Sequence, residues 1–161
     1  MKPENIINLS QIGLKPDGSK VAHYDSNVSD IDSFDMGSKL LFFEVRELAP
    51  GKLSCPYHFH TDEEEVFIII EGEALLRQNN SKRVVKKGDL LFFKRGPEGA
   101  HQLFNHTDLP MKYLDLSTNR DTGRVQYPDS NKISVGDGHI YKQDDQVDYY
   151  SGEINIPDFW M

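Results

Sequence analysis

The sequence has one cysteine, Cys55, in 161 residues, so no disulfide can form within the chain. A protein without disulfides is expected in a reducing compartment. Long apolar runs are also missing: the longest, Val66 to Ile70, has five residues, whereas a helix that spans a bilayer needs about twenty. The first residues, Met1 to Asn5, lack the apolar core of a signal peptide. We therefore expect a cytoplasmic protein with no membrane partner.

Basic residues are few as well. The chain has 18 Lys and Arg residues against 26 Asp and Glu residues, a formal net charge of −8. Nucleic acids and anionic membrane surfaces attract basic patches, and here the basic residues gather only in short pairs at residues 82–83, 86–87 and 94–95. Apolar residues at helical spacing are missing from residues 1–39, so we expect no helix-turn-helix there. We expect no nucleic-acid partner.

Short apolar runs separated by turn residues fill the middle of the chain, with no helical insert between them. This pattern predicts an all-β sandwich or barrel. The expected strands are residues 40–46, 57–60, 65–71, 73–78, 82–86, 89–93, 101–105 and 112–117. Asn79-Asn80 lies where a hairpin turn is needed. Several runs are apolar without alternation, which indicates burial on both faces and is expected if one sheet packs against a second subunit.

The two ends of the chain differ from this middle part. Residues 1–39 are polar and rich in turn residues, and we expect an arm with one or two short strands lying on the barrel. Residues 119–161 lose the strand pattern, which predicts an extended tail whose final aromatic residues dock on the barrel or on a partner subunit. The pattern also allows a short helix near residues 143–150. At 161 residues we expect one domain, with residues 40–118 as its core.

Four residues form a candidate metal site. His58 and His60 are two apart, so in a β-strand their side chains point to the same face. If the chain turns back, Glu65 on the next strand can reach the same point, and His101 opens a later strand after a loop of glycine and proline. Imidazole nitrogen and carboxylate oxygen are suitable ligands for one divalent ion of Fe, Mn, Ni, Co or Zn.

These residues give the chain a resemblance to the cupin superfamily. The first cupin motif reads G-x5-H-x-H-x3,4-E-x6-G, and the sequence fits it at His58, His60, Glu65 and Gly72. The leading glycine, Gly51, lies one residue early, with six residues before His58.

The second cupin motif reads G-x5-P-x-G-x2-H-x3-N. The sequence fits it at Gly88, Gly96, His101 and Asn105. Lys94 takes the place of the usual proline, and four residues instead of two separate Gly96 from His101. Both departures lie in the loop, so they put the rim of the pocket in question more than the ligands. The sequence is most similar to small single-domain bacterial cupins of an uncharacterised subgroup.

The resemblance implies a double-stranded β-helix, also called a jelly-roll barrel, and often a homodimer. It also implies that His58, His60, Glu65 and His101 hold one metal ion with coordination positions left open for a small-molecule ligand or substrate. Cupins use such sites for dioxygenation, decarboxylation, isomerisation of sugars or sugar phosphates, and simple ligand binding. The fold does not choose among these activities.

Several neighbouring residues have two interpretations. Glu64 competes with Glu65 as the carboxylate ligand, but strand alternation favours Glu65, and Glu63 and Glu64 are expected in solvent. Asn105 can orient a ligand or secure a turn, and we favour the turn. Cys55 can be a pocket thiol or an ordinary small residue, and we favour the latter because no partner base can be named.

We expect an enzyme that acts on a small oxygen-rich metabolite, as an oxygenase or an isomerase, with Glu65 either as a ligand or as a base. The alternatives are a non-catalytic protein that binds or senses a small molecule, and a metal that only stiffens the barrel. An enzyme needs a proton-transfer group or oxygen access beside the metal, so a polar side chain other than the ligands should face the open site. Asp115, on the same strand face as Tyr113, is a candidate acid behind the ligands. A sugar-phosphate isomerase needs a basic residue that grips phosphate inside the barrel, and only Lys94 and Arg95 at the rim can be named.

Overall fold

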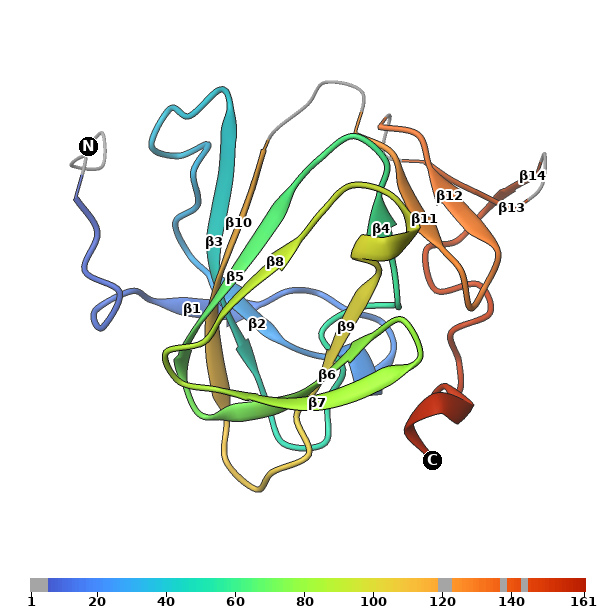
Figure 1. The fold of residues 1–161 in the computed structure, drawn as a ribbon. Coiled ribbons are helices and arrows are strands. Elements are labelled where there is room, and N and C mark those ends of the chain that lie inside the picture. The colour runs from blue at the N-terminus through green and yellow to red at the C-terminus, as the bar shows by residue number, and fades with distance from the viewer. Residues whose placement is uncertain (1–5, 119–122, 137–138, 143–144) are drawn as a thin grey trace.

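The computed structural model describes residues 6–118, 123–136, 139–142 and 145–161 (Figure 1). Its regular elements are β-strands and three short 3-10 turns, which confirms the expected all-β fold. The strands are β1 (Leu14–Pro16), β2 (Asn27–Ser29), β3 (Leu41–Leu48), β4 (Phe59–His60), β5 (Glu65–Glu71), β6 (Glu73–Gln78), β7 (Ser81–Lys86), β8 (Leu90–Phe93), β9 (His101–Phe104), β10 (Met111–Thr118), β11 (Val125–Tyr127), β12 (Lys132–Ser134), β13 (Ile140–Lys142) and β14 (Asp145–Val147). The 3-10 turns are η1 (Ala22–Tyr24), η2 (Pro97–Gly99) and η3 (Asp158–Trp160).

The described strands form three antiparallel sheets. The largest has the order β1-β2-β3-β10-β5-β8, the second has the order β14-β13-β12-β11-β4, and the third has the order β7-β6-β9. The neighbours β3 and β10 are far apart in sequence, as are β6 and β9, which is the crossing pattern of a double-stranded β-helix. Figure 1 shows the sheets curving around a common interior.

The eight strands expected between residues 40 and 118 are all present, with bounds that differ by one or two residues. Asn79 has a φ of 54° in the turn between β6 and β7, where the hairpin was predicted. Asparagine adopts this left-handed conformation more readily than most residues. Gly72 turns the chain between β5 and β6 with a φ of 75°, and a Cβ there would lie 2.9 Å from the carbonyl oxygen of Pro110.

The main core lies between the sheets. Side chains alternate along β5 and β10, so that one set of apolar residues points inward from each strand. The buried cluster contains Leu48, Phe67, Ile69, Ala74, Leu76, Val85, Phe93, Leu103, Met111 and Tyr113. The inward residues at the other end of β10 are polar: Asp115 and Ser117. The barrel is therefore packed at one end and polar at the other.

The region after β10 differs from the sequence-based expectation. Residues 125–147 contain four short strands, β11 to β14, which pair with one another and join β4 through β11. These strands could not be predicted from the sequence, because each has only three residues and is held by backbone pairing. They therefore show no apolar alternation. The expected helix near residues 143–150 is wrong where it can be checked, since β14 occupies 145–147 and residues 143–144 lie outside the described part.

The end of the chain docks on the barrel, as expected for its aromatic residues. Trp160 Nε1 donates a hydrogen bond of 2.7 Å to Gln102 Oε1. The guanidinium carbon of Arg77 lies 4.3 Å from the centre of the Phe159 ring and 3.7 Å from that of Tyr57. Arg77 also forms a paired hydrogen bond with Asp129.

The N-terminal part lies along the largest sheet. Its two short strands, β1 and β2, pair with each other, and β2 pairs with β3. Two short strands were expected here, but they extend the largest sheet at its edge. Within the described residues, no helix has the length and apolar character needed to cross a membrane.

Candidate metal centre

Backbone pairing brings the candidate ligands of two distant segments together. His58, just before β4, forms an isolated antiparallel bridge with His101, the first residue of β9. The His101 amide donates to the His58 carbonyl at 2.9 Å, and the His58 amide donates to the His101 carbonyl at 3.3 Å. The loop before His101 is tight, because a Cβ on Gly99 would lie 1.7 Å from the Lys94 carbonyl oxygen. Glycine is therefore required at residue 99.

Each histidine is oriented through its Nδ1 atom. His58 Nδ1 lies 3.0 Å from the Pro56 carbonyl oxygen, and His101 Nδ1 lies 2.9 Å from that of Gly99. His60 Nδ1 lies 2.9 Å from Glu63 Oε2. An Nδ1–H that donates to such an oxygen fixes the tautomer in which Nε2 carries the free lone pair. His58 and His101 are therefore arranged to offer Nε2, whereas the contact of His60 Nδ1 with Glu63 is an ion pair without hydrogen-bond geometry.

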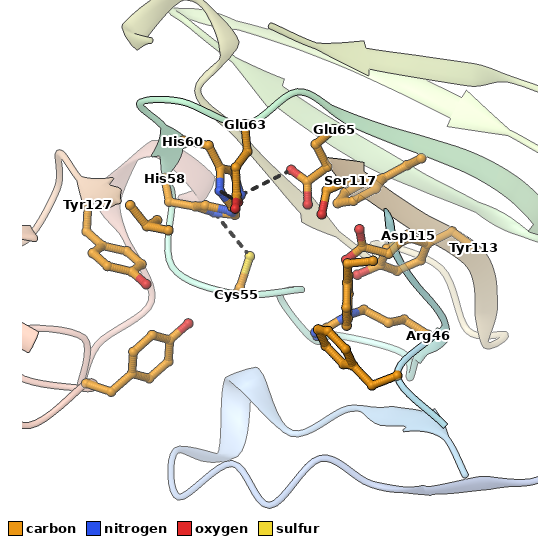
Figure 2. Close-up of a pocket in the computed structure, with 15 residues that line it drawn as sticks. Arg46, Cys55, His58, His60, Glu63, Glu65, Tyr113, Asp115, Ser117 and Tyr127 are labelled. Carbon is orange, nitrogen blue, oxygen red and sulfur yellow. Dashed lines mark hydrogen bonds and ion pairs between the residues drawn. The ribbon is translucent and has the colours of Figure 1, made fainter. Parts of the chain in front are cut away.

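The Nε2 atoms of His60 and His101 approach the carboxylate of Glu65, the first residue of β5. Glu65 Oε2 lies 3.0 Å from His101 Nε2 and 3.6 Å from His60 Nε2. One ligand atom each from His58, His60 and Glu65 lies within 4.8 Å of the others. Figure 2 shows these three side chains converging at one end of a cavity.

The donor atoms fit a metal ion. His60 Nε2, His101 Nε2 and Glu65 Oε2 are buried and make no hydrogen bond of good geometry within the described residues. Unpartnered buried polar atoms carry a large free-energy cost, and a divalent ion would satisfy all three. His58, His60 and Glu65 form a group that could hold such an ion. His101, the fourth ligand predicted from the sequence, is not part of this group but lies beside it, with its Nε2 3.0 Å from Glu65 Oε2.

The ionisable groups of the site shift one another's pKa values. Burial, together with the neighbouring His101 and His60, lowers the pKa of His58 well below its usual value, so this imidazole is neutral. Burial alone would lower the pKa of His60, but the Glu63 and Glu65 carboxylates outweigh it and raise that pKa. Burial alone would raise the pKa of Glu65, but the histidines, His101 foremost, lower it, so Glu65 is ionised.

The cavity beside these ligands has a volume of about 310 Å³. It lies between the largest sheet and the sheet of β4 and β11 to β14 (Figure 2). Its lining residues are Phe34, Phe42, Arg46, Cys55, His58, His60, Glu63, Glu65, Phe67, Tyr113, Asp115, Ser117, Val125, Tyr127 and Tyr149.

A buried charged cluster faces the cavity from β3 and β10. The register pairs Asp115 with Glu44, and Tyr113 with Arg46. Arg46 forms an ion pair with Glu44, and its Nε lies 3.4 Å from Asp115 Oδ2. Burial and the Glu65 carboxylate raise the pKa of Asp115 well above its usual range. Asp115 was named from the sequence, but Arg46 and Glu44 were missed because no local motif marks them.

The structure also shows the roles of three neighbouring residues, Asn105, Glu63 and Cys55, for which the sequence left two interpretations. Asn105 is fully buried and secures a turn, since its Nδ2 donates to the carbonyls of Leu48 and Leu109 at 2.8 Å. Glu64 is exposed as expected, but Glu63 is not in solvent and instead contacts His60. Cys55 is a pocket thiol, contrary to the favoured interpretation, and its Sγ lies 3.4 Å from His58 Nδ1.

The Cupin domain family model matches residues 44–117. The match covers 74 of the 161 residues, and this part of the chain is similar to a cupin domain. The matched residues run from β3 to β10 and include all four candidate ligands. An uncharacterised protein from Methanocaldococcus jannaschii is 37% identical over 60 residues, which are 37% of this chain and 46% of that protein. This match therefore spans less than half the length of the relative.

Solved structures resemble the chain over a larger part of its length. A sugar phosphate isomerase from Silicibacter pomeroyi has a TM-score of 0.70 and 20% identity, covering 88% of this chain and 90% of that one. A predicted oxalate decarboxylase from Thermotoga maritima has a TM-score of 0.59 and 21% identity, covering 71% and 99%. The polyketide cyclase RemF from Streptomyces resistomycificus has a TM-score of 0.59 and 17% identity, covering 72% and 80%. At these identities the likeness shows the fold.

Proposed function

We propose that this protein binds one divalent metal ion through His58, His60, Glu65 and His101 and is an enzyme that acts on a small oxygen-rich metabolite. The observation that carries the proposal is that the imidazoles gather around Glu65. His58, His60 and Glu65 each offer a ligand atom within 4.8 Å of the others, and carbonyl oxygens contact Nδ1 of His58 and His101. The Nε2 atoms of His60 and His101 approach Glu65 Oε2. Such an arrangement of neighbouring groups is typical of histidines that bind metals.

The bound metal would act as a Lewis acid or as a template for substrate oxygens. Four protein ligands leave positions open on an ion that accepts five or six, and the cavity of about 310 Å³ lies beside them. This volume suits a metabolite rather than a polymer. The activity is of the oxygenase or isomerase type.

An enzyme is favoured over a protein that only binds or senses a small molecule. Asp115 is a polar side chain other than the ligands that faces the cavity, and it lies beside Arg46 and near Glu65. A carboxyl group that keeps its proton next to an ionised carboxylate is suited to proton transfer. Simple binding would leave this buried charged cluster without a role.

The test is the metal content of protein purified without an affinity tag, measured by mass spectrometry. We expect about one metal ion per chain, lost in His58→Ala and kept in the control His106→Ala, because His106 is exposed and lies outside the cavity lining. Wild-type protein that takes up no metal even after reloading would contradict the proposal. Metal-loaded protein that binds a metabolite without converting it would support the binding alternative.

A homodimer is the second part of the proposal. Leu90 and Phe92 on β8 are 64% and 53% exposed, and both point to the outer face of the largest sheet. Val66 and Ile68 on the neighbouring strand β5 are paired with Phe92 and Leu90, so the apolar outer face extends from β8 onto β5. A second copy of the chain, related by a two-fold axis, would cover the same face on both subunits.

A further inference from the structure

We infer that the cavity selects a planar ligand without a phosphate group, in which an aromatic ring carries two adjacent oxygens as in a catechol. This inference rests on the proposed metal-binding function and names its substrate class. It is drawn from the aromatic walls of the cavity and from the pairing of its positive charge.

Aromatic rings form half of the lining residues other than the candidate ligands. Of the 15 lining residues, six are phenylalanine or tyrosine: Phe34, Phe42, Phe67, Tyr113, Tyr127 and Tyr149. Val125 is the one aliphatic lining residue among those the structure describes. Aromatic side chains offer flat faces and edges that favour stacked or edge-on contact with another ring.

One row of rings begins at the ligand set. The Tyr127 ring centre lies 6.0 Å from that of His58 and 5.7 Å from that of Tyr149. The planes of Tyr127 and Tyr149 are almost perpendicular, at 88°. Both tyrosines come from the part of the chain that forms the second sheet or directly follows it. A ring bound to the metal through its oxygens would lie beside this row.

A second pair of rings lies on the other side of the cavity. Phe34 and Phe42 have ring centres 5.8 Å apart, and they come from a turn and from β3. Phe34 is 53% exposed although it belongs to the lining. An exposed aromatic side chain at a cavity rim gains free energy if a ligand covers it. Phe34 is therefore positioned to contact the outer part of the ligand.

The charges of the lining disfavour phosphate. Arg46 is the one lysine or arginine among the described lining residues, and it is already paired with Glu44 and Asp115. Phosphate recognition uses cationic side chains whose donors are directed at its oxygens. The rim residue Lys94 does not line the cavity and pairs with Glu98.

The lining also carries a surplus of acidic side chains. Glu63, Glu65 and Asp115 face the cavity against Arg46 alone. Because Asp115 keeps its proton, the negative charge of this wall comes from the Glu63 and Glu65 carboxylates, which would balance one divalent ion. Arg46 is held by Glu44 and Asp115, so no cationic side chain of the described lining is left to bind a phosphate dianion. A ligand with little charge that chelates the metal through two oxygens meets these conditions.

The test uses cobalt-loaded protein and two probes. We would titrate 4-nitrocatechol, followed by its own visible absorption, and ribose 5-phosphate, followed by competition with it, using metal-free protein as the blank. We expect 4-nitrocatechol to bind at least tenfold more tightly than ribose 5-phosphate. Phe34→Ala should weaken 4-nitrocatechol binding by about fivefold to tenfold, on the scale of one aromatic contact, without changing the cobalt content.

Leu109→Ala is the control, because Leu109 is 72% exposed, does not line the cavity and lies outside the proposed dimer face. It should leave 4-nitrocatechol binding unchanged. Equal or tighter binding of ribose 5-phosphate, or an unchanged affinity in Phe34→Ala, would overturn the inference while the metal site stands. Wild-type protein that takes up no cobalt would overturn the inference together with the proposed function.

Discussion

The Sγ atom of Cys55 lies 3.4 Å from His58 Nδ1, on the side where the Pro56 carbonyl oxygen lies 3.0 Å from the same nitrogen. The thiol is therefore beside the imidazole but on the opposite side of the ring from Nε2. It can stabilise the ring orientation, but it does not take part in the ligand set formed by Nε2 and Glu65.

Cys55 should react slowly in the native protein. Burial raises the pKa of its thiol to about 12, so the reactive thiolate is scarce at pH 8. Relative to a thiol with a pKa near its ordinary value, we expect alkylation by iodoacetamide to be slower by about a thousandfold, from the thiolate fraction alone. Mass spectrometry of native and urea-unfolded protein measures both rates. Similar rates in the two states would show that the thiol is accessible and ionised.

Stability of the metal-free protein should depend on pH through His60. Its pKa is raised in the folded state, so the stabilising contribution is complete below the usual value of 6.5 and is lost as pH rises through the folded value. His58 acts in the opposite direction, because its pKa is lowered by burial. Comparing wild type with His60→Gln isolates the first contribution.

The measurement is urea unfolding in the presence of EDTA at pH 5.5 and pH 8. The difference in free energy of unfolding between wild type and His60→Gln should be larger at pH 5.5. A difference that is constant, or larger at pH 8, would show that Glu63 does not hold a proton on His60 in the folded protein.

The candidate ligands and the barrel strands could be named from the sequence because both follow local rules. His58 and His60 share a face by strand alternation, and the apolar run of β5 needs no knowledge of its neighbours. The surroundings of the cavity depend on strand register, which pairs Asp115 with Glu44 and brings Arg46 to the same wall. No spacing in the sequence encodes that register. Strands β11 to β14 were missed for a related reason, since backbone pairing defines them more than composition does.

The contact between Trp160 and Gln102 should stabilise the folded chain. Gln102 is fully buried, and its Nε2 also donates to the Cys55 carbonyl oxygen at 2.7 Å. Trp160→Phe keeps an aromatic side chain but removes the indole N–H that donates to Gln102 Oε1. Leaving that buried oxygen without a partner should cost about 1–3 kcal/mol.

Chemical denaturation checks this cost, with Met161→Ala as the control because Met161 is 87% exposed. The control should change the free energy of unfolding by less than about 0.5 kcal/mol. Equal stabilities of Trp160→Phe and wild type would mean that the end of the chain is not docked on the barrel in solution.

The apolar outer face of the largest sheet should hold two copies of the chain together. Leu90→Glu places a carboxylate on this face, where burial against a partner would cost on the order of several kcal/mol without a compensating charge. Sedimentation velocity should therefore show a dimer for wild type and a monomer for Leu90→Glu. Leu109→Glu is the control, because Leu109 is 72% exposed but lies in the loop between β9 and β10. A wild-type monomer, or dissociation caused equally by both variants, would rule out this face as the interface.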